Sequence, residues 1–421
     1  MTNERAVAVR SRCSGLMRRA PPGTWDPGSE PTILPLPLMT SPRVNVKPAL
    51  YRWAYERNRL TIEQASERFP HLTSWIGGET QPTLKQLEAF AKAMHAGIGN
   101  FFADAPPDEP LPIHDFRTVA GKPIARPSPD LLETLYACQM RQSWFQDFAE
   151  EEHDDPLDFV GSAKLTDSPL DVAAEMRARL AFDLAARRAM SSWTEALRQF
   201  IAHADDAGVL VMCSGIVGSD THRKLDPEEF RGFALVDPVA PLVFVNGADT
   251  KSAQMFTLAH ELAHVWLGAT GVSNVEAAAS PADATERWCD QVAAELLVPL
   301  DVFASEYHPK AELQGELARL ARVFKVSTLV VLRRMHDAGG ISRQRMWDEY
   351  RAERARLLAL KRGTGGDFYL STAARVSKRF ARALIVSTWE GRSTFSEAFR
   401  LLGVRKMATF RGLSDSLGMA V

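Results

Sequence analysis

Three residues near the middle of the chain, His260, Glu261 and His264, have types and a spacing that can bind a metal ion. They form the pattern HExxH in a stretch of helical periodicity that runs from about Ser252 to Leu267. A spacing of four residues places both imidazoles on one face of a helix, where they can bind the same ion. Zinc lowers the pKa of a bound water to about 7, and a carboxylate at Glu261 can accept the proton.

A second predicted helix, from Glu286 to Leu297, supplies two acids that fit the same site. Glu286 would complete a set of two histidines and one glutamate, which leaves one zinc position open for water. Asp290, one turn further, can accept the free ring N–H of His260 or His264 and so fix its tautomer. The alternative is that both acids lie near a helix N-terminus because the helix dipole favours them there.

Other residues compete with Glu286 for the role of third ligand. Glu276 lies in a loop of small residues that could bend towards the metal, and Glu295 lies further along the second helix. Glu295 could instead form a buried salt bridge. A site closed by Cys289 or Asp290 would be structural and would leave Glu261 without a role.

These two motifs together resemble the ImmA/IrrE family of metallo-endopeptidases. Its members share HExxH and a later helix of the form ExxA(N/D)xFAAxLLMP, here Glu286-Arg-Trp-Cys-Asp-Gln-Val-Ala-Ala-Glu-Leu-Leu-Val-Pro299. The sequence departs from this form at three packing positions, Cys289, Val292 and Val298. The resemblance covers about residues 170–340. It implies a bound Zn²⁺, a gluzincin-like ligand set and a protein substrate.

The elements that must position this site predict an α+β fold that is mainly helical. Amphipathic helices are expected over residues 130–151 and 170–207, and strands over 208–212, 230–236 and 242–245. The resemblance implies a zincin-like peptidase domain with a small sheet. In zincins an edge strand binds the substrate chain in extended form. Residues 230–236 and 242–245 are candidates for that edge; the equal alternative is that either is a buried strand with no substrate role.

The N-terminal part divides into two segments. Residues 1–42 contain six prolines from Pro21 to Pro37, which predicts disorder, or a misassigned start with Met39 as the true one. Residues 43–105 are predicted to form four or five short helices. Three motifs follow in order: Leu60-Thr-Ile-Glu-Gln-Ala65, Trp75-Ile-Gly-Gly-Glu79 and Pro82-Thr-Leu-Lys-Gln-Leu87. This order resembles the Xre-type helix-turn-helix domain that precedes many such peptidases, and the resemblance implies an all-α bundle that binds DNA.

In such a domain the second helix of the motif, here 70–77, enters the major groove. His71, Thr73 and Ser74 are its candidate base readers, although they read bases less well than Arg, Asn or Gln. The alternative is a bundle used for dimerisation or docking. A homodimer would also strengthen DNA binding, because two half-sites multiply the phosphate contacts.

The remaining chain is a linker and helical region over 106–169, the peptidase domain over 170–340, and a C-terminal region over 341–421. The C-terminal region is predicted to be helical and basic, with 16 Lys and Arg against 7 Asp and Glu. This surplus suits nucleic acid or an acidic partner, or a solvated helix face. The whole chain has a net charge of only -2.

Composition places the protein in the cytoplasm and away from membranes. The hydrophobic fraction of 45% and the charged fraction of 24% are ordinary for globular proteins. The four cysteines form no CxxC pair, which fits a reducing compartment. No run of 18 apolar residues and no signal-peptide pattern is found.

Two functions fit these features. The first is a zinc-dependent regulatory endopeptidase that cleaves a protein partner, such as a repressor or a toxin, while DNA binding places it near that target. The second is a DNA-binding transcription regulator or an antitoxin of a toxin–antitoxin pair, in which the metal site is sensory or structural. Glu261 decides between them, because only a peptidase needs a base beside the metal.

Overall fold

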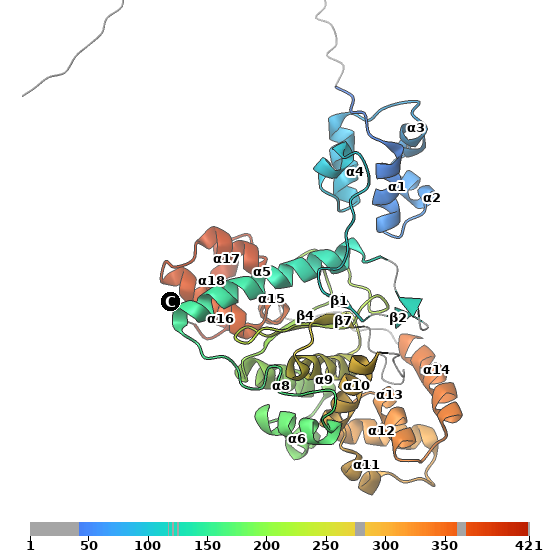
Figure 1. The fold of residues 1–421 in the computed structure, drawn as a ribbon, viewed down its shortest axis with the longest axis vertical. Helices are drawn as coiled ribbons and strands as arrows, with labels where there is room; N and C mark the ends of the chain where they lie inside the picture. Colours follow the sequence, from blue (N-terminus) through green and yellow to red (C-terminus); the bar gives the residue numbers. More distant parts are fainter. Residues whose placement is uncertain are drawn as a thin grey trace, which may run out of the picture.

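The computed structural model describes residues 42–116, 118–119, 122–123, 126–273, 283–359 and 368–419. These residues form a mainly helical protein around one five-stranded sheet, which confirms the predicted α+β class (Figure 1). Residues 1–41 of the segment predicted to be disordered lie outside the described part. Among the described helices, none has the length and apolar character needed to cross a bilayer.

The first unit is a small helical bundle with its own aromatic core. Its elements are α1 (Pro48–Arg57), α2 (Ile62–Arg68), α3 (Leu72–Ile76), α4 (Leu84–Ala93) and the 3-10 helix η1 (Ile98–Phe102). Thr61 and Thr83 begin α2 and α4 with capping boxes. The rings of Tyr51, Trp75 and Phe90 pack together at the centre. This bundle projects from one end of the molecule (Figure 1).

The sheet has the strand order β1-β7-β5-β6-β4. Its strands are β1 (His114–Asp115), β4 (Leu210–Ser214), β5 (Gly232–Leu235), β6 (Leu242–Asn246) and β7 (Gly271–Ser273). β5 is antiparallel to both of its neighbours, whereas β4 is parallel to β6 and β1 is parallel to β7. Of the two alternatives for 230–236 and 242–245, the edge strand is wrong and the buried strand is confirmed, because β5 and β6 are internal and buried throughout. Long-range pairing, which local periodicity does not encode, decides the strand order.

Helices bury both faces of this sheet, so its strands read as continuous apolar runs rather than alternating ones. Val211, Ala234 and Val243 belong to a core shared with α6 (Pro169–Arg179), α8 (Trp193–Asp206), α9 (Lys251–Leu267) and α10 (Ala284–Leu297). Met212 and Phe233, which point to the opposite face, belong to a second core shared with α5 (Pro129–Glu152) and the C-terminal helices.

Beyond α10 the chain forms a helical layer that supports the site from outside. It consists of α11 (Leu300–Glu306), α12 (Leu313–Phe324), α13 (Thr328–Asp337) and α14 (Arg343–Ala359), while α7 (Leu184–Ala189) contacts α12. α13 packs against both α12 and α14. Two arginines of α13, Arg333 and Arg334, form ion pairs with acids of α10. The layer therefore holds the helix that carries Glu286.

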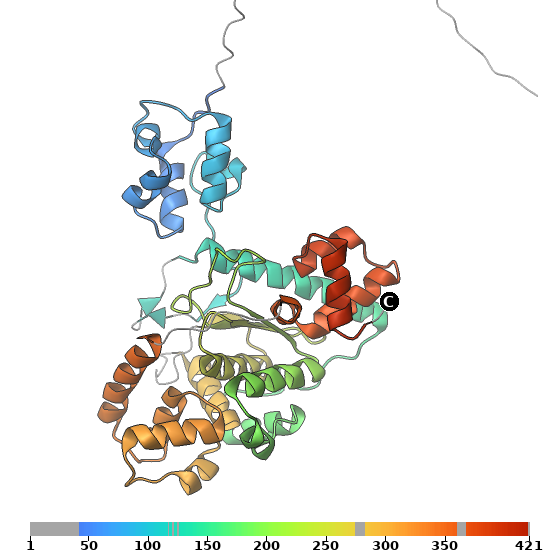
Figure 2. The same cartoon turned by 180° about the vertical axis from the view of Figure 1, so that it is seen from behind.

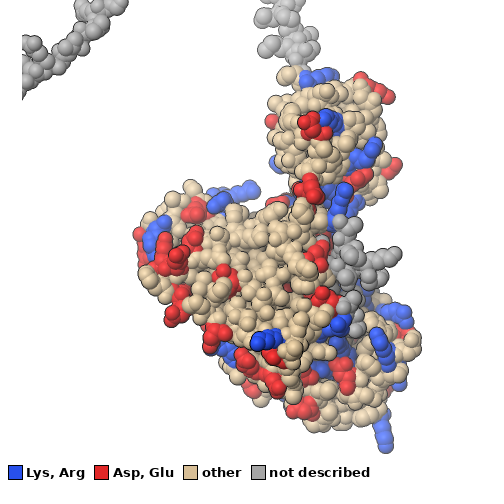
Figure 3. Space-filling view, viewed as in Figure 1, with Lys and Arg blue, Asp and Glu red and all other residues tan. Residues whose placement is uncertain are grey.

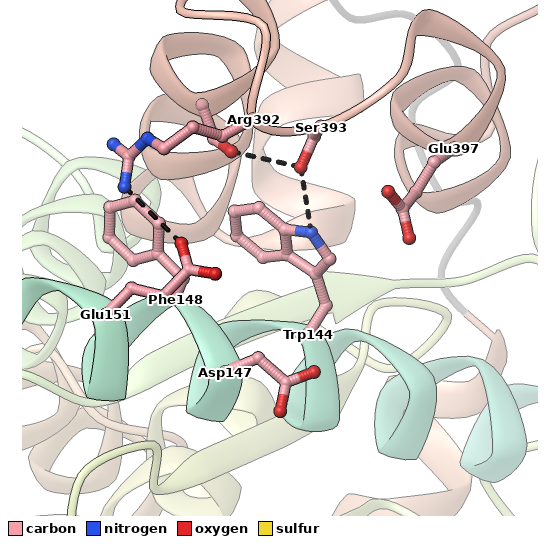
Figure 4. Close-up of a pocket in the computed structure, with 8 residues that line it drawn as sticks. Trp144, Asp147, Phe148, Glu151, Arg392, Ser393 and Glu397 are labelled. Carbon is pink, nitrogen blue, oxygen red and sulfur yellow. Dashed lines mark hydrogen bonds and ion pairs between the residues drawn. The ribbon is translucent and has the colours of Figure 1, made fainter.

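The C-terminal helices pack on the long helix α5 (Figure 2). They are α15 (Phe368–Val376), α16 (Lys378–Trp389), α17 (Phe395–Leu402) and α18 (Met407–Ser416). Figure 4 shows the polar part of this contact: the indole N–H of Trp144 donates to the hydroxyl of Ser393 at 3.2 Å, and Arg392 lies 3.6 Å from Glu151. Part of the basic surplus predicted here is thus paired with acids of α5.

A linker joins the N-terminal bundle to the sheet. It contains β1 and the small hairpin of β2 (Thr118–Val119) and β3 (Lys122–Pro123). Arg57 pairs with Glu109 of the linker at 2.6 Å, and Arg59 pairs with Glu229, just before β5, at 3.0 Å. These ion pairs hold the bundle close to the domain that carries the HExxH motif.

Candidate metal centre

His260, Glu261 and His264 lie on α9, a helix that is buried from Gln254 to Trp266. Thr250 begins this helix by accepting a hydrogen bond from the N–H of Ala253, and Gly268, with a φ of 76°, ends it. Because α9 runs through the core, its motif residues face packed elements and not solvent. The pattern predicted a helix from about 252 to 267, and the structure has Lys251–Leu267.

Glu286 and Asp290 lie on α10, which packs closely against α9. Asp283 begins α10 by accepting hydrogen bonds from the N–H groups of Thr285 and Glu286. Glu286 is therefore in the first turn, with its side chain directed at the HExxH helix. Glu286 therefore lies where the helix dipole favours an acid and also where a metal ligand is needed, so the two interpretations of this residue are compatible.

The structure brings together the three predicted ligands, His260, His264 and Glu286. Their ligand atoms all lie within 4.8 Å of one another, and all three residues are buried. Nε2 of His264 lies 3.0 Å from Nε2 of His260 and 3.0 Å from a Glu286 oxygen, and Nε2 of His260 lies 3.5 Å from the other oxygen. Two donors about 2.05 Å from a tetrahedral zinc ion are roughly 3.3 Å apart. The donor set therefore fits zinc in type and in spacing.

The charges of these side chains also favour a cation at their centre. Burial acts to lower the pKa of His260, but the carboxylates of Glu286 and Asp290 outweigh it and raise that pKa well above the ordinary value. Burial acts to raise the pKa of Glu286, but His260 and His264 lower it to about 2. Burial lowers the pKa of His264. The two buried carboxylates thus favour a positive charge at His260, whereas burial disfavours one on His264.

Asp290 lies behind His260, at the position predicted for a supporting carboxylate. Its Oδ1 is 3.0 Å from Nδ1 of His260, so the ring N–H can be donated to it while Nε2 remains free as a ligand. Arg333 of α13 lies 3.6 Å from the other oxygen of Asp290. Nδ1 of His264 is buried and has no hydrogen-bond partner among the described residues.

Glu261 is fully buried and lies beside the ligands without being one of the clustered three. Burial raises its pKa to about 8. The hydroxyl of Ser273, on β7, donates to Oε1, and Oε2 has no hydrogen-bond partner among the described residues. A Cβ atom on Gly232 would lie 2.7 Å from Oε1. Ser273 of β7 thus binds Oε1, which lies close to Gly232 of β5, and Oε2 is the oxygen left for a proton transfer.

Among the described residues, no rival ligand belongs to the three-residue cluster. Glu295 forms a buried ion pair with Arg334 at 2.9 Å, which is the alternative that the sequence left open for it. Cys289 is fully buried, and burial raises the pKa of its thiol well above the ordinary value. Glu276 lies outside the described residues.

Three residues that contact Glu261 or His264 were not predicted from the sequence: Gly232, Ser273 and Phe116. The ring of Phe116 lies 5.3 Å from the imidazole of His264, centroid to centroid. Ser273 and Phe116 belong to very short strands or their flanks, where periodicity carries no signal. Gly232 alone offered one, because a glycine inside a predicted strand often marks a close approach of another group.

The predicted DNA-contacting residues lie at α3, a helix of only five residues: His71 is its N-cap, and Thr73 and Ser74 belong to the helix. Leu72 and Trp75 of this helix are buried, His71 and Thr73 are exposed, and Ser74 is partly exposed. On the face seen in Figure 3 the bundle carries acidic as well as basic side chains. The structure therefore exposes His71 and Thr73, and the face of the bundle in Figure 3 is not uniformly basic.

Comparison with known proteins places the site inside a matched domain. Residues 204–336 match the family model described as the IrrE N-terminal-like domain (Peptidase_M78), and residues 376–416 match a domain family of unknown function, DUF8813. No curated protein and no solved structure matches the chain. The first match includes α9 and α10 and supports both the ImmA/IrrE resemblance and a metallopeptidase type of function.

Proposed function

We propose that this protein is a zinc-dependent endopeptidase that acts on a protein partner. His260, His264 and Glu286 would bind the zinc, and Glu261 would act as general base. The observation that carries this proposal is the convergence of the three ligand atoms within 4.8 Å in a buried setting, inside a domain that matches a metallopeptidase family.

Zinc bound at this site would supply a Lewis acid that polarises a carbonyl group and acidifies water. The protein supplies the other requirements. Asp290 orients His260, and Ser273 holds one oxygen of Glu261. The other oxygen of Glu261 would accept a proton and return it to a leaving amine, and the raised pKa of this buried carboxyl would make it a stronger base than an ordinary glutamate.

The proposal includes regulation through DNA. Residues 43–105 would bind an operator, as a monomer or a homodimer, and bring the peptidase to a repressor or toxin near the same operon. The separate core of this bundle and the exposure of His71 and Thr73 support this part. A cytoplasmic location fits the free cysteines Cys138, Cys213 and Cys289.

One observation favours the second candidate, a DNA-binding regulator or antitoxin with a sensory or structural metal. His260 and Glu261 are both 0% exposed, and His264 is 1% exposed. A peptidase needs access to its base and its metal, whereas a structural site does not.

Two substitutions separate these candidates. Glu261→Gln keeps the size of the side chain and removes the base, so zinc content and folding should persist while partner cleavage falls about 10²–10⁴-fold. His264→Ala removes a ligand and should abolish both zinc binding and cleavage. Glu175→Gln, an exposed change of the same kind on α6, is the control. Regulation that survives Glu261→Gln but not His264→Ala would favour the regulator over the peptidase.

A further inference from the structure

A segment of the linker covers the site as an additional strand. β1 pairs in parallel with β7, His114 opposite Gly271 and Asp115 opposite Val272. The N–H of Phe116 then donates to the carbonyl of Val272 at 3.0 Å. On its other side β7 pairs with β5. Both edges of β7, the strand that carries the Ser273 partner of Glu261, are therefore filled by the chain itself.

The side chain of Phe116 extends this cover onto the metal ligands. The Phe116 ring lies against the imidazole of His264, with a centroid distance of 5.3 Å and an angle of 30° between the ring planes. The ring of His114 lies 4.3 Å from the Phe116 ring, centroid to centroid. Gly271 makes this position available, because a Cβ atom there would collide with the Phe116 ring. Backbone pairing of residues 114–116 with β7 thus places the Phe116 ring against the His264 imidazole.

This placement matches what an extended substrate would need. A peptide that binds by β-augmentation requires a strand edge with free N–H and carbonyl groups beside the catalytic residues. β7 is the strand that meets this description here, since Ser273 contacts Glu261 and β5 lies on its inner side. The edge that a substrate would use is the edge that β1 occupies.

We propose that residues 114–116 form an autoinhibitory strand, which an extended polypeptide segment must displace to reach the site. This inference rests on the proposed peptidase function. The displacing segment would be a stretch of a protein partner that presents an aromatic or large apolar side chain to the face of His264. The burial of His260 and Glu261 is then a property of the covered state.

The short length and exposure of β1 favour its detachment from β7. It consists of two residues, far fewer than a stable edge strand has, and His114 and Asp115 are both exposed. Four prolines between 106 and 112 precede it and connect it to the helix-turn-helix bundle. A linker of that composition favours extended backbone, so release of β1 requires no helix to unfold.

Phe116→Ala tests the proposal, because it removes the ring but leaves the backbone able to pair. The first readout is hydrogen exchange, which needs neither substrate nor cleavage. The amide of residue 116 should exchange at least tenfold faster in Phe116→Ala than in the unaltered protein. Phe116→Tyr keeps an aromatic ring over His264 and should exchange as the unaltered protein does. An amide that is already unprotected in the unaltered protein would overturn the inference.

The second readout is binding of dye-labelled β-casein, an unfolded chain, to zinc-loaded protein that also carries Glu261→Gln. Fluorescence anisotropy should show at least tenfold tighter binding with Phe116→Ala, and no change with Phe102→Ala, a control at an exposed phenylalanine of η1. Equal binding with and without Phe116→Ala would overturn the inference. Thermal unfolding of each variant establishes that it is folded.

Cleavage of the same casein by proteins with Glu261 intact separates this inference from the proposed function. Tighter binding by Phe116→Ala without any cleavage would support the covering strand and contradict the peptidase. Equal cleavage by the unaltered protein and by Phe116→Ala would support the peptidase and contradict the covering strand. Faster cleavage by Phe116→Ala alone would support both.

Discussion

The carboxylate of Asp290 lies 3.0 Å from Nδ1 of His260, whereas Nε2 of the same ring faces Glu286. The imidazole is therefore held from one side and presented to the ligand cluster from the other. Arg333, 3.6 Å from the second Asp290 oxygen, connects this pair to α13. The orientation of a ligand on α9 thus depends on residues of two other helices.

Asp290→Asn should lower zinc affinity about 10–100-fold, the usual effect of removing a carboxylate behind a ligating histidine. The amide keeps the shape of the side chain but loses the charge that favours the donated N–H. Competition with a fluorescent zinc chelator measures the affinity. An unchanged affinity would show that Asp290 serves only to pair with Arg333.

The purified protein should contain about one zinc ion per chain, and Glu286→Ala should reduce this content because two histidines alone hold the ion poorly. Metal analysis by mass spectrometry provides the measurement. Glu276→Ala is the matched control, since Glu276 is the rival that the sequence offered. Loss of zinc in Glu276→Ala with retention in Glu286→Ala would transfer the third ligand to residue 276.

Gly232→Ala should impair catalysis without removing zinc. The added Cβ would lie 2.7 Å from both Oε1 of Glu261 and Cγ2 of Thr257, so the carboxylate would have to move. A displaced general base costs up to about 10²–10⁴-fold in rate. Cleavage rate and zinc content are to be compared with those of Gly315→Ala, where the nearest atom is the end of the Glu312 side chain at 3.1 Å. Full activity in Gly232→Ala would mean that Glu261 does not need its present position.

Stability should depend on pH through Asp205. Burial raises its pKa from 3.8 to about 7, although it accepts hydrogen bonds from the Ser377 hydroxyl at 2.8 Å and the Val211 N–H at 3.2 Å. Between pH about 4 and 7 the folded state therefore keeps a proton on Asp205 that the unfolded state has already released. The free energy of unfolding should fall as pH rises through that window, by at most about 4 kcal/mol from this group.

Asp205→Asn removes this titration and should flatten the profile. Urea unfolding at pH 5 and at pH 8 gives the free energy of unfolding of both proteins. Relative to Asp205→Asn, the unaltered protein should be more stable at pH 5 than at pH 8. The same difference at both pH values would mean that Asp205 titrates near its ordinary pKa in the folded protein.

DNA binding should be specific and strongly dependent on salt, since phosphate contacts release counterions. Full-length protein titrated against DNA from upstream of its own gene should bind more weakly as salt rises. Replacing His71, Thr73 and Ser74 together by alanine should reduce discrimination between this DNA and an unrelated duplex. Binding that is absent at all salt concentrations would favour a docking role for the bundle. Removal of residues 341–421 shows separately whether the basic region contributes.

The parts of the site that could be predicted are those specified within one helix. The spacing of His260 and His264 and the position of Glu286 follow from helix periodicity, and α9 extends only one residue beyond its predicted start. The three strands 208–212, 230–236 and 242–245 were also recognisable, because buried strands are apolar throughout. Local pattern thus identified the main residues and elements.

The parts that could not be predicted depend on pairing between distant segments. β1 has two residues in a proline-rich linker and β7 has three in a loop of small residues, so neither has a detectable period. The order of the strands follows from these pairings, and this is why the sequence left open whether β5 and β6 are edge strands or buried ones. The contacts of Phe116 and Ser273 exist only once those strands have formed.

The pairing of β1 with β7 also bears on which proteins could be cut. A tethered strand that detaches stays near its edge at an effective concentration on the order of millimolar. In the proposed peptidase, a freely diffusing protein at micromolar concentration would compete poorly with it. If the N-terminal bundle binds DNA as proposed, a target held on the same DNA would itself be tethered and would compete more effectively. Selectivity would then come from co-localisation rather than from the recognition of one cleavage sequence.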